Sequence, residues 1–371
     1  MTKEKNGTKK TRVSWTTVRF TATKKKRRFI VIFAFVVMSI YSIVTLFPIY
    51  ALIIRSFVPT KEATTLHLWI PEAQEVDMNQ QVGNLAVFYD LDLRDFKKAM
   101  GIPQTEFIMA RTTLKEISQK YKIPEEKIKD YFKNFYILNG WITLLFKTDF
   151  FKALLRTFLV TAISCIGITV LSIFTGYGLA GLRRRDQMFV YNIYLLQMVI
   201  PAMLILLPQY QLVQWVARLI PGYGNPGLTR ATTQLLTIIL INIKGTALST
   251  MIFTSFISSI PKDLEDAAFI DGTTRFQYVW RVLFPLLKVP IVSILVIQFP
   301  LIYNQFLEPY VYLDERYTTV LPLMQTVAGQ FSTNFQVIYA CVVGSLIPIV
   351  IIYLIFRRFF VEGVLAGAIK G

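Results

Sequence analysis

Six long apolar runs divide this chain, and they constrain its fold more than any other feature. They cover about residues 29–54, 153–182, 189–216, 234–256, 286–303 and 336–356. About 20 apolar residues suffice for a helix to cross the hydrocarbon core of a bilayer, where backbone groups must be bonded within the chain. The chain is 54% hydrophobic and only 17% charged. The sequence therefore predicts an all-α polytopic membrane protein with about six transmembrane helices.

The distribution of basic residues predicts how these helices are oriented. Residues 24–28 are all Lys or Arg and precede the first run, and residues 183–185 and 357–358 follow the second and sixth runs. Basic residues beside a span are retained on the cytoplasmic side. Both termini are then cytoplasmic in a multi-pass plasma-membrane protein. The net charge of +17 indicates contact with anionic membrane lipid rather than binding of nucleic acid.

These features divide the chain into five parts. We expect a basic cytoplasmic tail at 1–28, the first transmembrane helix at 29–57, a helical extracytoplasmic insert at 58–150, a transmembrane core at 151–360 and a cytoplasmic tail at 361–371. The core contains an outer turn at 221–227, which is rich in Pro and Gly. It also contains a polar cytoplasmic loop at 261–285.

The insert at 58–150 is nearly neutral, and its pattern indicates folded helix rather than linker. Apolar residues recur at helical spacing over 93–100, 107–121 and 125–136. Residues 114–131 also resemble a DNA-binding helix-turn-helix. Their mixed charge and their expected position outside the cell argue against nucleic acid. Two packed amphipathic helices are the preferred interpretation.

Neither a metal site nor a disulfide framework is expected. Cys165 and Cys341 lie within apolar runs, where small buried residues are the ordinary interpretation. His67 is the single histidine, so the spacing of His and Cys offers no metal ligands. We expect no catalytic residue and no cofactor bound by this chain.

The polar loop at 261–285 has the sequence of a short helix placed between two apolar runs. Pro261 suits the first turn, where its missing N–H is not needed. Asp263, Glu265 and Asp266 follow, where carboxylates interact favourably with the helix dipole. Gly272 can adopt positive φ and is expected to end the helix.

Other residues of the loop indicate what such a helix can do. Ala267 and Ala268 are expected to leave one face without bulk, so that the backbone of another protein can approach. Thr274 with Gln277 predicts a capping box for a second helix, and Pro285 marks the bent return to the membrane. The helix is either a docking element for a cytoplasmic partner or an interfacial helix without one. Residue types alone leave both interpretations open.

The loop resembles the EAA loop in permease subunits of bacterial ABC importers. That pattern reads EAA, three residues, Gly, nine residues, Ile, one residue and Leu-Pro. Here the corresponding residues are Asp266, Ala267, Ala268, Gly272, Val282, Phe284 and Pro285. The departures are Asp for Glu, Val for Ile and Phe for Leu, and Glu265 supplies a neighbouring carboxylate.

Other segments resemble the carbohydrate permeases within that family. Residues 303–309, YNQFLEP, resemble a WN-x-FLWP-like stretch, and residues 198–201 with 207–210 resemble a third-span pattern. Residues 360–371 resemble the terminal tail of the MalG-like half of the group. The likeness covers about residues 29–57 and 150–371, and it leaves the insert unexplained.

The resemblance implies a non-catalytic half of a carbohydrate importer, expected to carry an oligosaccharide. Such a half pairs with a second, MalF-like permease, docks on a cytoplasmic ATPase dimer that binds ATP-Mg, and receives sugar from an extracellular solute-binding protein. The implied ATPase-coupling residues are Glu265, Asp266, Ala267, Ala268, Gly272 and Pro285. The chain has no G-x-x-x-x-G-K-[ST] phosphate loop, so a partner must hydrolyse the ATP.

Four residues near the fifth run are candidates for the substrate pathway because sugar sites combine aromatic faces with hydrogen-bonding side chains. They are Gln298, Tyr303, Asn304 and Gln305. The alternative is that they form polar contacts between helices. Two other functions also stay open: an ABC permease for another solute, such as amino acids or phosphate, and a membrane-anchored sensor.

Overall fold

The computed structural model describes residues 24–59, 62, 67–70, 76–89, 91–219, 228–243, 246–330 and 334–368. Over these residues the chain is helical, and its only strand-like feature is an isolated bridge between Gln81 and Thr113. The prediction of an all-α chain is confirmed. The expected tail before residue 24, the turn at 221–227 and the terminal residues 369–371 lie outside the described residues.

The chain separates into two compact units, Met1–Ala51 and Leu52–Gly371. The first is described by most of α1, Lys24–Arg55, which is long and apolar enough to cross a membrane. Its apolar side chains are exposed along the helix, including Phe33, Phe35 and Tyr41. A helix that is apolar on all sides is typical of a membrane span.

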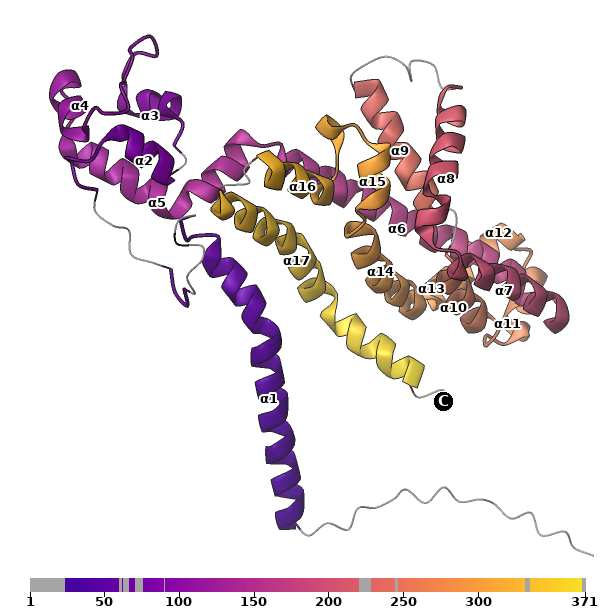
Figure 1. Cartoon of the computed structure of the whole chain (residues 1–371). Coiled ribbons are helices and arrows are strands. Elements are labelled where there is room, and N and C mark those ends of the chain that lie inside the picture. The colour runs from indigo at the N-terminus through magenta and orange to yellow at the C-terminus, as the bar shows by residue number, and fades with distance from the viewer. Residues whose placement is uncertain are drawn as a thin grey trace, which may run out of the picture. The chain divides into compact units, whose positions relative to one another are not determined.

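Four helices build the insert at the start of the second unit: α2 Val82–Tyr89, α3 Leu93–Met100, α4 Leu114–Tyr121 and α5 Glu125–Lys147. Helices α2 to α4 gather around the first half of α5 (Figure 1). Their buried residues form one hydrophobic cluster, in which Phe96, Ile117 and Phe132 are almost fully enclosed. The insert therefore has a core of its own.

Local capping explains where the predicted helices of the insert differ from the observed ones. Helix α3 begins and ends as expected. The helix expected at 107–121 begins only at Leu114, because the Thr113 side chain accepts from the backbone N–H of Glu116 in a capping box. The prediction over 107–113 is wrong, α2 was not predicted, and α5 continues eleven residues beyond the expected end at 136.

Helix α6, Phe150–Ala180, packs against α9, α10 and α14 in the core. Its buried residues recur every three or four positions, and many are small or carry hydroxyls. The hydroxyls of Thr157 and Thr161 donate to the carbonyls four residues earlier, at 2.8 and 2.7 Å, so they are satisfied inside the helix. At Gly176 a Cβ would lie 3.0 Å from the Cβ of Phe253. Glycine thus permits the close approach of α10.

Two of the six expected spans, the third and the fourth, are built from two successive helices. They are α7 Arg184–Val199 with α8 Ala202–Ala217, and α9 Leu228–Ile243 with α10 Ala247–Ile257. The fifth expected span is the single helix α14, Lys288–Tyr303, and the preceding residues 275–286 are bent by 78° relative to it. The described residues contain three helices that could cross a membrane unaided, or up to six spans if each bent pair counts as one.

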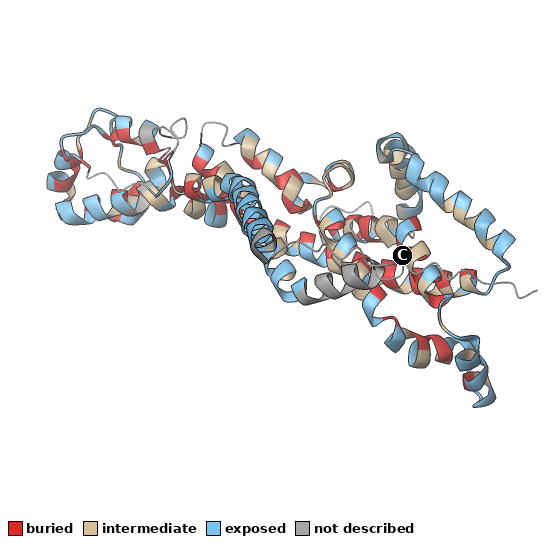
Figure 2. Ribbon diagram, turned by 90° about the horizontal axis from the view of Figure 1, so that it is seen from below, coloured by how far each residue is buried: buried red, intermediate tan, exposed pale blue. Residues whose placement is uncertain are grey.

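The remaining helices lie between α14 and the C-terminal end. They are α15 Leu307–Tyr312, the 3-10 turn η3 Glu315–Tyr317, α16 Val320–Gln330 and α17 Phe335–Ala368. Buried residues lie where the core helices cross, and exposed residues dominate the outlying helices (Figure 2). Helix α7 has no buried residue and exposes Leu196 and Val199. An apolar surface of this kind suits contact with lipid or another membrane subunit.

Candidate functional site

The polar loop folds as the short helix α11, Lys262–Ile270, with Pro261 at its N-cap position. Gly272 follows at φ +81°, and its N–H donates to the carbonyl of Phe269 at 3.0 Å. Thr274 and Gln277 form the expected capping box at the start of α12, Arg275–Tyr278. The predicted stop and restart of the helix are both confirmed. They hold α11 and α12 at a fixed turn.

The two faces of α11 differ in composition and exposure. Four exposed residues share its outer face at spacings of three, one and three: Asp263, Asp266, Ala267 and Ile270. Ile270 is 85% exposed, which is unusual for an isoleucine beside a well-packed core. We call these four residues the outer stripe. It combines two carboxylates, one small residue and one apolar side chain.

Ala268 lies on the opposite face from the outer stripe. It is buried in a cluster with Tyr278, Val279 and Leu283 of the following turns. The expectation that both alanines leave one open face is therefore wrong for Ala268, because helix geometry turns consecutive residues by about 100°. A small residue is needed there because α11 lies close to its own chain.

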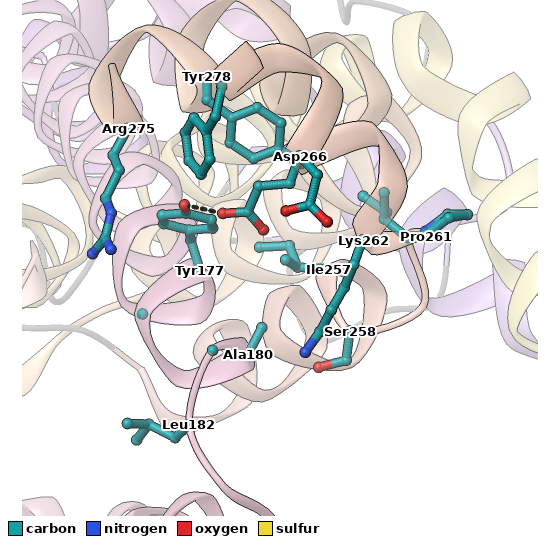
Figure 3. A pocket seen from close by; sticks show the side chains of 15 residues that line it. Tyr177, Ala180, Leu182, Ile257, Ser258, Pro261, Lys262, Asp266, Arg275 and Tyr278 are labelled. Atoms are coloured by element: carbon teal, nitrogen blue, oxygen red, sulfur yellow. Dashed lines mark hydrogen bonds between the residues drawn. The ribbon is translucent and has the colours of Figure 1, made fainter. Parts of the chain in front are cut away.

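A hydrogen bond joins α11 to the end of α6. The hydroxyl of Tyr177 donates to Oε1 of the half-buried Glu265 at 2.5 Å (Figure 3). The Tyr177 ring also lies 5.9 Å from the ring of Tyr278, and Phe269 contacts Tyr278 from α11 at 5.8 Å. Glu265 was expected only to neighbour the EAA positions. The structure places it as the brace between α11 and α6.

Sequence reasoning did not identify Tyr177. It stands near the end of a long apolar run, where a tyrosine ordinarily indicates an interfacial aromatic. Nothing local in the sequence connects it to Glu265. Only the packing of α6 against the loop reveals the pair.

A second set of aromatic contacts holds the segment after α11. Phe174 of α6 stacks on Phe276 at 5.9 Å and meets Trp280 edge to face, and Trp280 contacts Phe284 at 5.3 Å. These residues flank the π-helix η2, Val279–Leu283, in which the N–H of Phe284 bonds to the carbonyl of Val279. Pro285 follows, exposed and without an N–H to donate. The π turn therefore lies where the chain bends back toward α14.

A cavity of about 550 Å³ lies beneath α11, between the ends of α6 and α10. Charged groups reach it from several sides: Lys262, Glu265, Asp266 and Arg275. Figure 3 shows Lys262 and Arg275 on opposite sides of the Tyr177–Glu265 contact. Within the described residues, no group of three or more His, Cys, Asp or Glu could hold a metal ion.

The four candidate pathway residues do not form one site. Tyr303 is buried, and its hydroxyl donates to the carbonyl of Ser345 at 2.9 Å, so it belongs to helix packing. Asn304 is exposed and ends α14. Gln298 and Gln305 line a separate small cavity. Sequence reasoning missed two other residues of that cavity, Asn242 and Thr246.

The chain matches a known protein family. Residues 168–365, more than half of the chain, match the family described as binding-protein-dependent transport system inner membrane component. This range contains α11, the outer stripe, the three bent helix pairs and α14.

Individual relatives carry names from sugar transport. The chain is 26% identical over 236 residues to the probable starch degradation products transport system permease protein AmyC of Thermoanaerobacterium thermosulfurigenes, covering 63% of this chain and 81% of that protein. It is 35% identical over 128 residues to the trehalose/maltose transport system permease protein MalG of Thermococcus litoralis, covering 33% and 45%.

A solved structure has a similar fold. It is the crystal structure of a bacterial ABC transporter involved in the import of the acidic polysaccharide alginate. One of its chains matches with a TM-score of 0.57 over 91% of this chain and 99% of that chain, at 16% identity. At this identity the likeness concerns the fold alone.

Proposed function

The chain belongs to the family of binding-protein-dependent transport system inner membrane components, the permeases of ABC importers, and we propose that it translocates a carbohydrate, specifically an oligosaccharide. It is a multi-pass membrane subunit without catalytic chemistry of its own. The names of its relatives, which concern starch products and trehalose or maltose, support a sugar as the transported solute. Membership in this family removes the support for a membrane-anchored sensor.

The observation that carries the coupling mechanism is the exposed outer stripe on a braced helix. A cytoplasmic ATPase can contact Asp263, Ala267 and Ile270 without disturbing the core, because these side chains are exposed and do not line the cavity beneath α11. Force applied to α11 reaches α6 through Glu265 and Tyr177 and reaches α14 through the π turn. Closure of an ATPase dimer on ATP-Mg would thereby move two membrane helices together.

The proposed role in coupling also implies which partner proteins complete the transporter. The chain would pair with a MalF-like permease, which covers the exposed apolar surface of the core, and an extracellular solute-binding protein would deliver the sugar. About six spans would place both termini and α11 in the cytoplasm. The insert at 58–150 would then lie outside, where its separate core suits a scaffold or a docking surface for the binding protein.

Crosslinking tests the docking role directly. The variant Ala267→Cys, with Cys165 and Cys341 replaced by Ala, should form a crosslink to an ATPase in membranes, and mass spectrometry should identify the second permease in the same complex. The matched control is Ala268→Cys, whose side chain is buried. Crosslinks from Ala267→Cys only to extracellular proteins would contradict both the topology and the docking role.

Deletion of residues 76–136, which retains the part of α5 that packs against α17, tests the proposal for the insert. We expect weaker coupling to the binding protein and slower uptake, with the complex still assembled. Unchanged uptake and unchanged affinity for the binding protein would contradict a docking role for the insert.

A further inference from the structure

Three helix breaks meet at one small cavity within the core. The cavity has a volume of about 200 Å³ and is lined by Gln197 near the end of α7, by Asn242 and Thr246 on either side of the α9–α10 break, and by Gln298 and Gln305 before α15. Discontinuous helices in transporters free polar backbone and side-chain groups for ligand contacts. This volume lies below the roughly 300–1,000 Å³ of pockets that bind drug-sized ligands, so it suits one sugar ring rather than a chain of rings.

A reciprocal pair of amides closes one side of this cavity. Nδ2 of Asn242 donates to Oε1 of Gln305 at 3.1 Å, and Nε2 of Gln305 donates to Oδ1 of Asn242 at 2.9 Å. Asn242 also donates to the hydroxyl of Ser164 on α6 at 3.4 Å. The pair fixes the α9 end against the α14–α15 break. Its members are oriented before any solute arrives.

Gln298 presents an acceptor that the protein does not use. Its Nε2 donates to the hydroxyls of Thr246 and Ser249, both at 3.1 Å. The residue is only 5% exposed, yet no hydrogen bond to its Oε1 is found within the described part of the chain. This oxygen is not among the fully buried atoms that lack a partner, so it is accessible from the cavity that Gln298 lines. It can therefore accept a hydrogen bond from a solute hydroxyl.

Glu308 is the only charged residue among the described residues that line the cavity. None of these described lining residues is Lys, Arg or aromatic, and the described part of the chain contains no salt bridge to Glu308. Carboxylates accept hydrogen bonds strongly and repel other anions. The lining is therefore rich in acceptors and unfavourable for a negatively charged solute.

We propose that this cavity selects one uncharged sugar ring of the transported chain. Gln298 and Glu308 accept hydrogen bonds from the ring hydroxyls, and Glu308 excludes sugars that carry a carboxylate. The aromatic face that sugar sites ordinarily use comes from the second permease, because the described residues that line this cavity include no aromatic side chain. The proposal rests on the function proposed above and specifies the solute class within it.

Charged thiol reagents test the proposal on the purified permease–ATPase complex, independently of the binding protein. Leu301 lines the cavity and is 61% exposed, so Leu301→Cys, with both native cysteines replaced by Ala, is a reporter. We expect a positively charged methanethiosulfonate to react at least tenfold faster than a negatively charged one. Glu308→Gln should remove most of this ratio. Glu315→Gln, an exposed carboxylate outside the cavity lining, should leave it unchanged.

Protection by a matched pair of sugars tests selectivity at the same reporter. Glucose and glucuronate differ by one carboxylate. Glucose should slow the reaction of the thiol reagent with Leu301→Cys. Glucuronate should slow this reaction only when Glu308→Gln is also present. Gln298→Leu should weaken protection by glucose about tenfold, as expected for one lost hydrogen bond to a ligand.

Several results would overturn the proposal. An unreactive reporter, equal reaction of both reagents in the presence of Glu308, or equal protection by glucose and glucuronate would each do so. Measuring oligosaccharide uptake in cells that lack the chain distinguishes a failure of the selectivity proposal from a failure of the proposed transport function. If uptake stays normal, the proposed function fails; if uptake is lost but protection does not discriminate, only the selectivity site fails.

Discussion

The hydroxyl of Tyr177 lies 2.5 Å from Oε1 of Glu265, although 88 residues separate the two in the chain. This contact connects α6, a helix long and apolar enough to cross a membrane, to the short helix α11. Each residue alone has an ordinary explanation, since tyrosines gather at membrane interfaces and acids favour the first turn of a helix. Together they form a mechanical connection that can be removed by deleting one oxygen atom.

We expect Tyr177→Phe to reduce solute uptake about tenfold while leaving assembly intact. A hydrogen bond to a charged group contributes about 1.5–3 kcal/mol, and the lower figure corresponds to about a tenfold change in rate. ATP hydrolysis should fall less than uptake, because the brace transmits motion and does not bind nucleotide. The measurement is uptake per ATP hydrolysed in proteoliposomes.

The control is Tyr278→Phe, which retains its ring contacts. No hydrogen bond from the Tyr278 hydroxyl is found among the described residues. Equal loss of uptake in both variants would show that the Tyr177 hydroxyl has no special part in coupling.

Gly272→Pro should abolish uptake without preventing membrane insertion. Proline fixes φ near −65° and has no N–H, whereas Gly272 has φ +81° and donates to the carbonyl of Phe269. Gly272→Ala should be milder, because no atom lies within 4 Å of its added Cβ and only the left-handed backbone is strained. Uptake assays with quantified membrane protein measure both effects. Gly329→Ala, which meets no neighbour, is the control, and normal uptake in Gly272→Pro would exclude a fixed turn.

Ala267→Trp and Ala268→Trp should fail in different ways. Ala267 belongs to the exposed outer stripe, so a bulky side chain there should prevent binding of the ATPase and abolish uptake in a normally folded protein. Ala268 is buried beside Tyr278 and Leu283, so the same change should reduce the folded protein itself. Size-exclusion profiles and ATPase co-purification distinguish the two. Normal ATPase binding by Ala267→Trp would contradict the proposal that the outer stripe contacts the ATPase.

Acid should weaken the insert through Glu106. The Tyr121 hydroxyl donates to this carboxyl at 2.9 Å, Lys120 pairs with it at 3.3 Å, and together they hold its pKa below the usual value of 4.5. A carboxyl with a lower pKa in the folded state stabilises the fold above its unfolded pKa, and this contribution is lost as the pH falls. Glu106→Gln should lower the unfolding temperature at about pH 7 and flatten its decrease toward pH 3.

Calorimetry across pH measures this effect in the purified protein. Glu126→Gln, an exposed acid on α5, is the matched control. A parallel pH profile for Glu106→Gln and the wild type would contradict a stabilising role for Glu106.

Local signals in the sequence predicted much of this structure. Apolar spacing over 93–100 predicted α3, and the capping pair Thr274 and Gln277 predicted the start of α12, because both signals depend on residues a few positions apart. Hydropathy predicted where apolar helices lie but not where they break, since an apolar run continues through a bend such as the one between α7 and α8. Pro201 was the available signal there.

The features that the sequence did not predict depend on contacts between residues far apart in the chain. The Tyr177–Glu265 and Asn242–Gln305 contacts join residues that are far apart in the chain, and no local pattern encodes them. The inward position of Ala268 depended on which side of α11 packs against its own chain. Tyr303 was a reasonable sugar contact by residue type, and its burial against α17 decides otherwise.

The π turn at Val279–Leu283 has a consequence for how this permease can change. Removing one residue from it would produce a more regular helix, yet every side chain downstream would rotate by about 100° relative to α11 and α12. Ile294 would leave the interior and Gln298 would face away from its hydroxyl partners. The π turn therefore determines which residues of α14 face the core. A variant with a shorter and more regular helix would point these residues in the wrong direction.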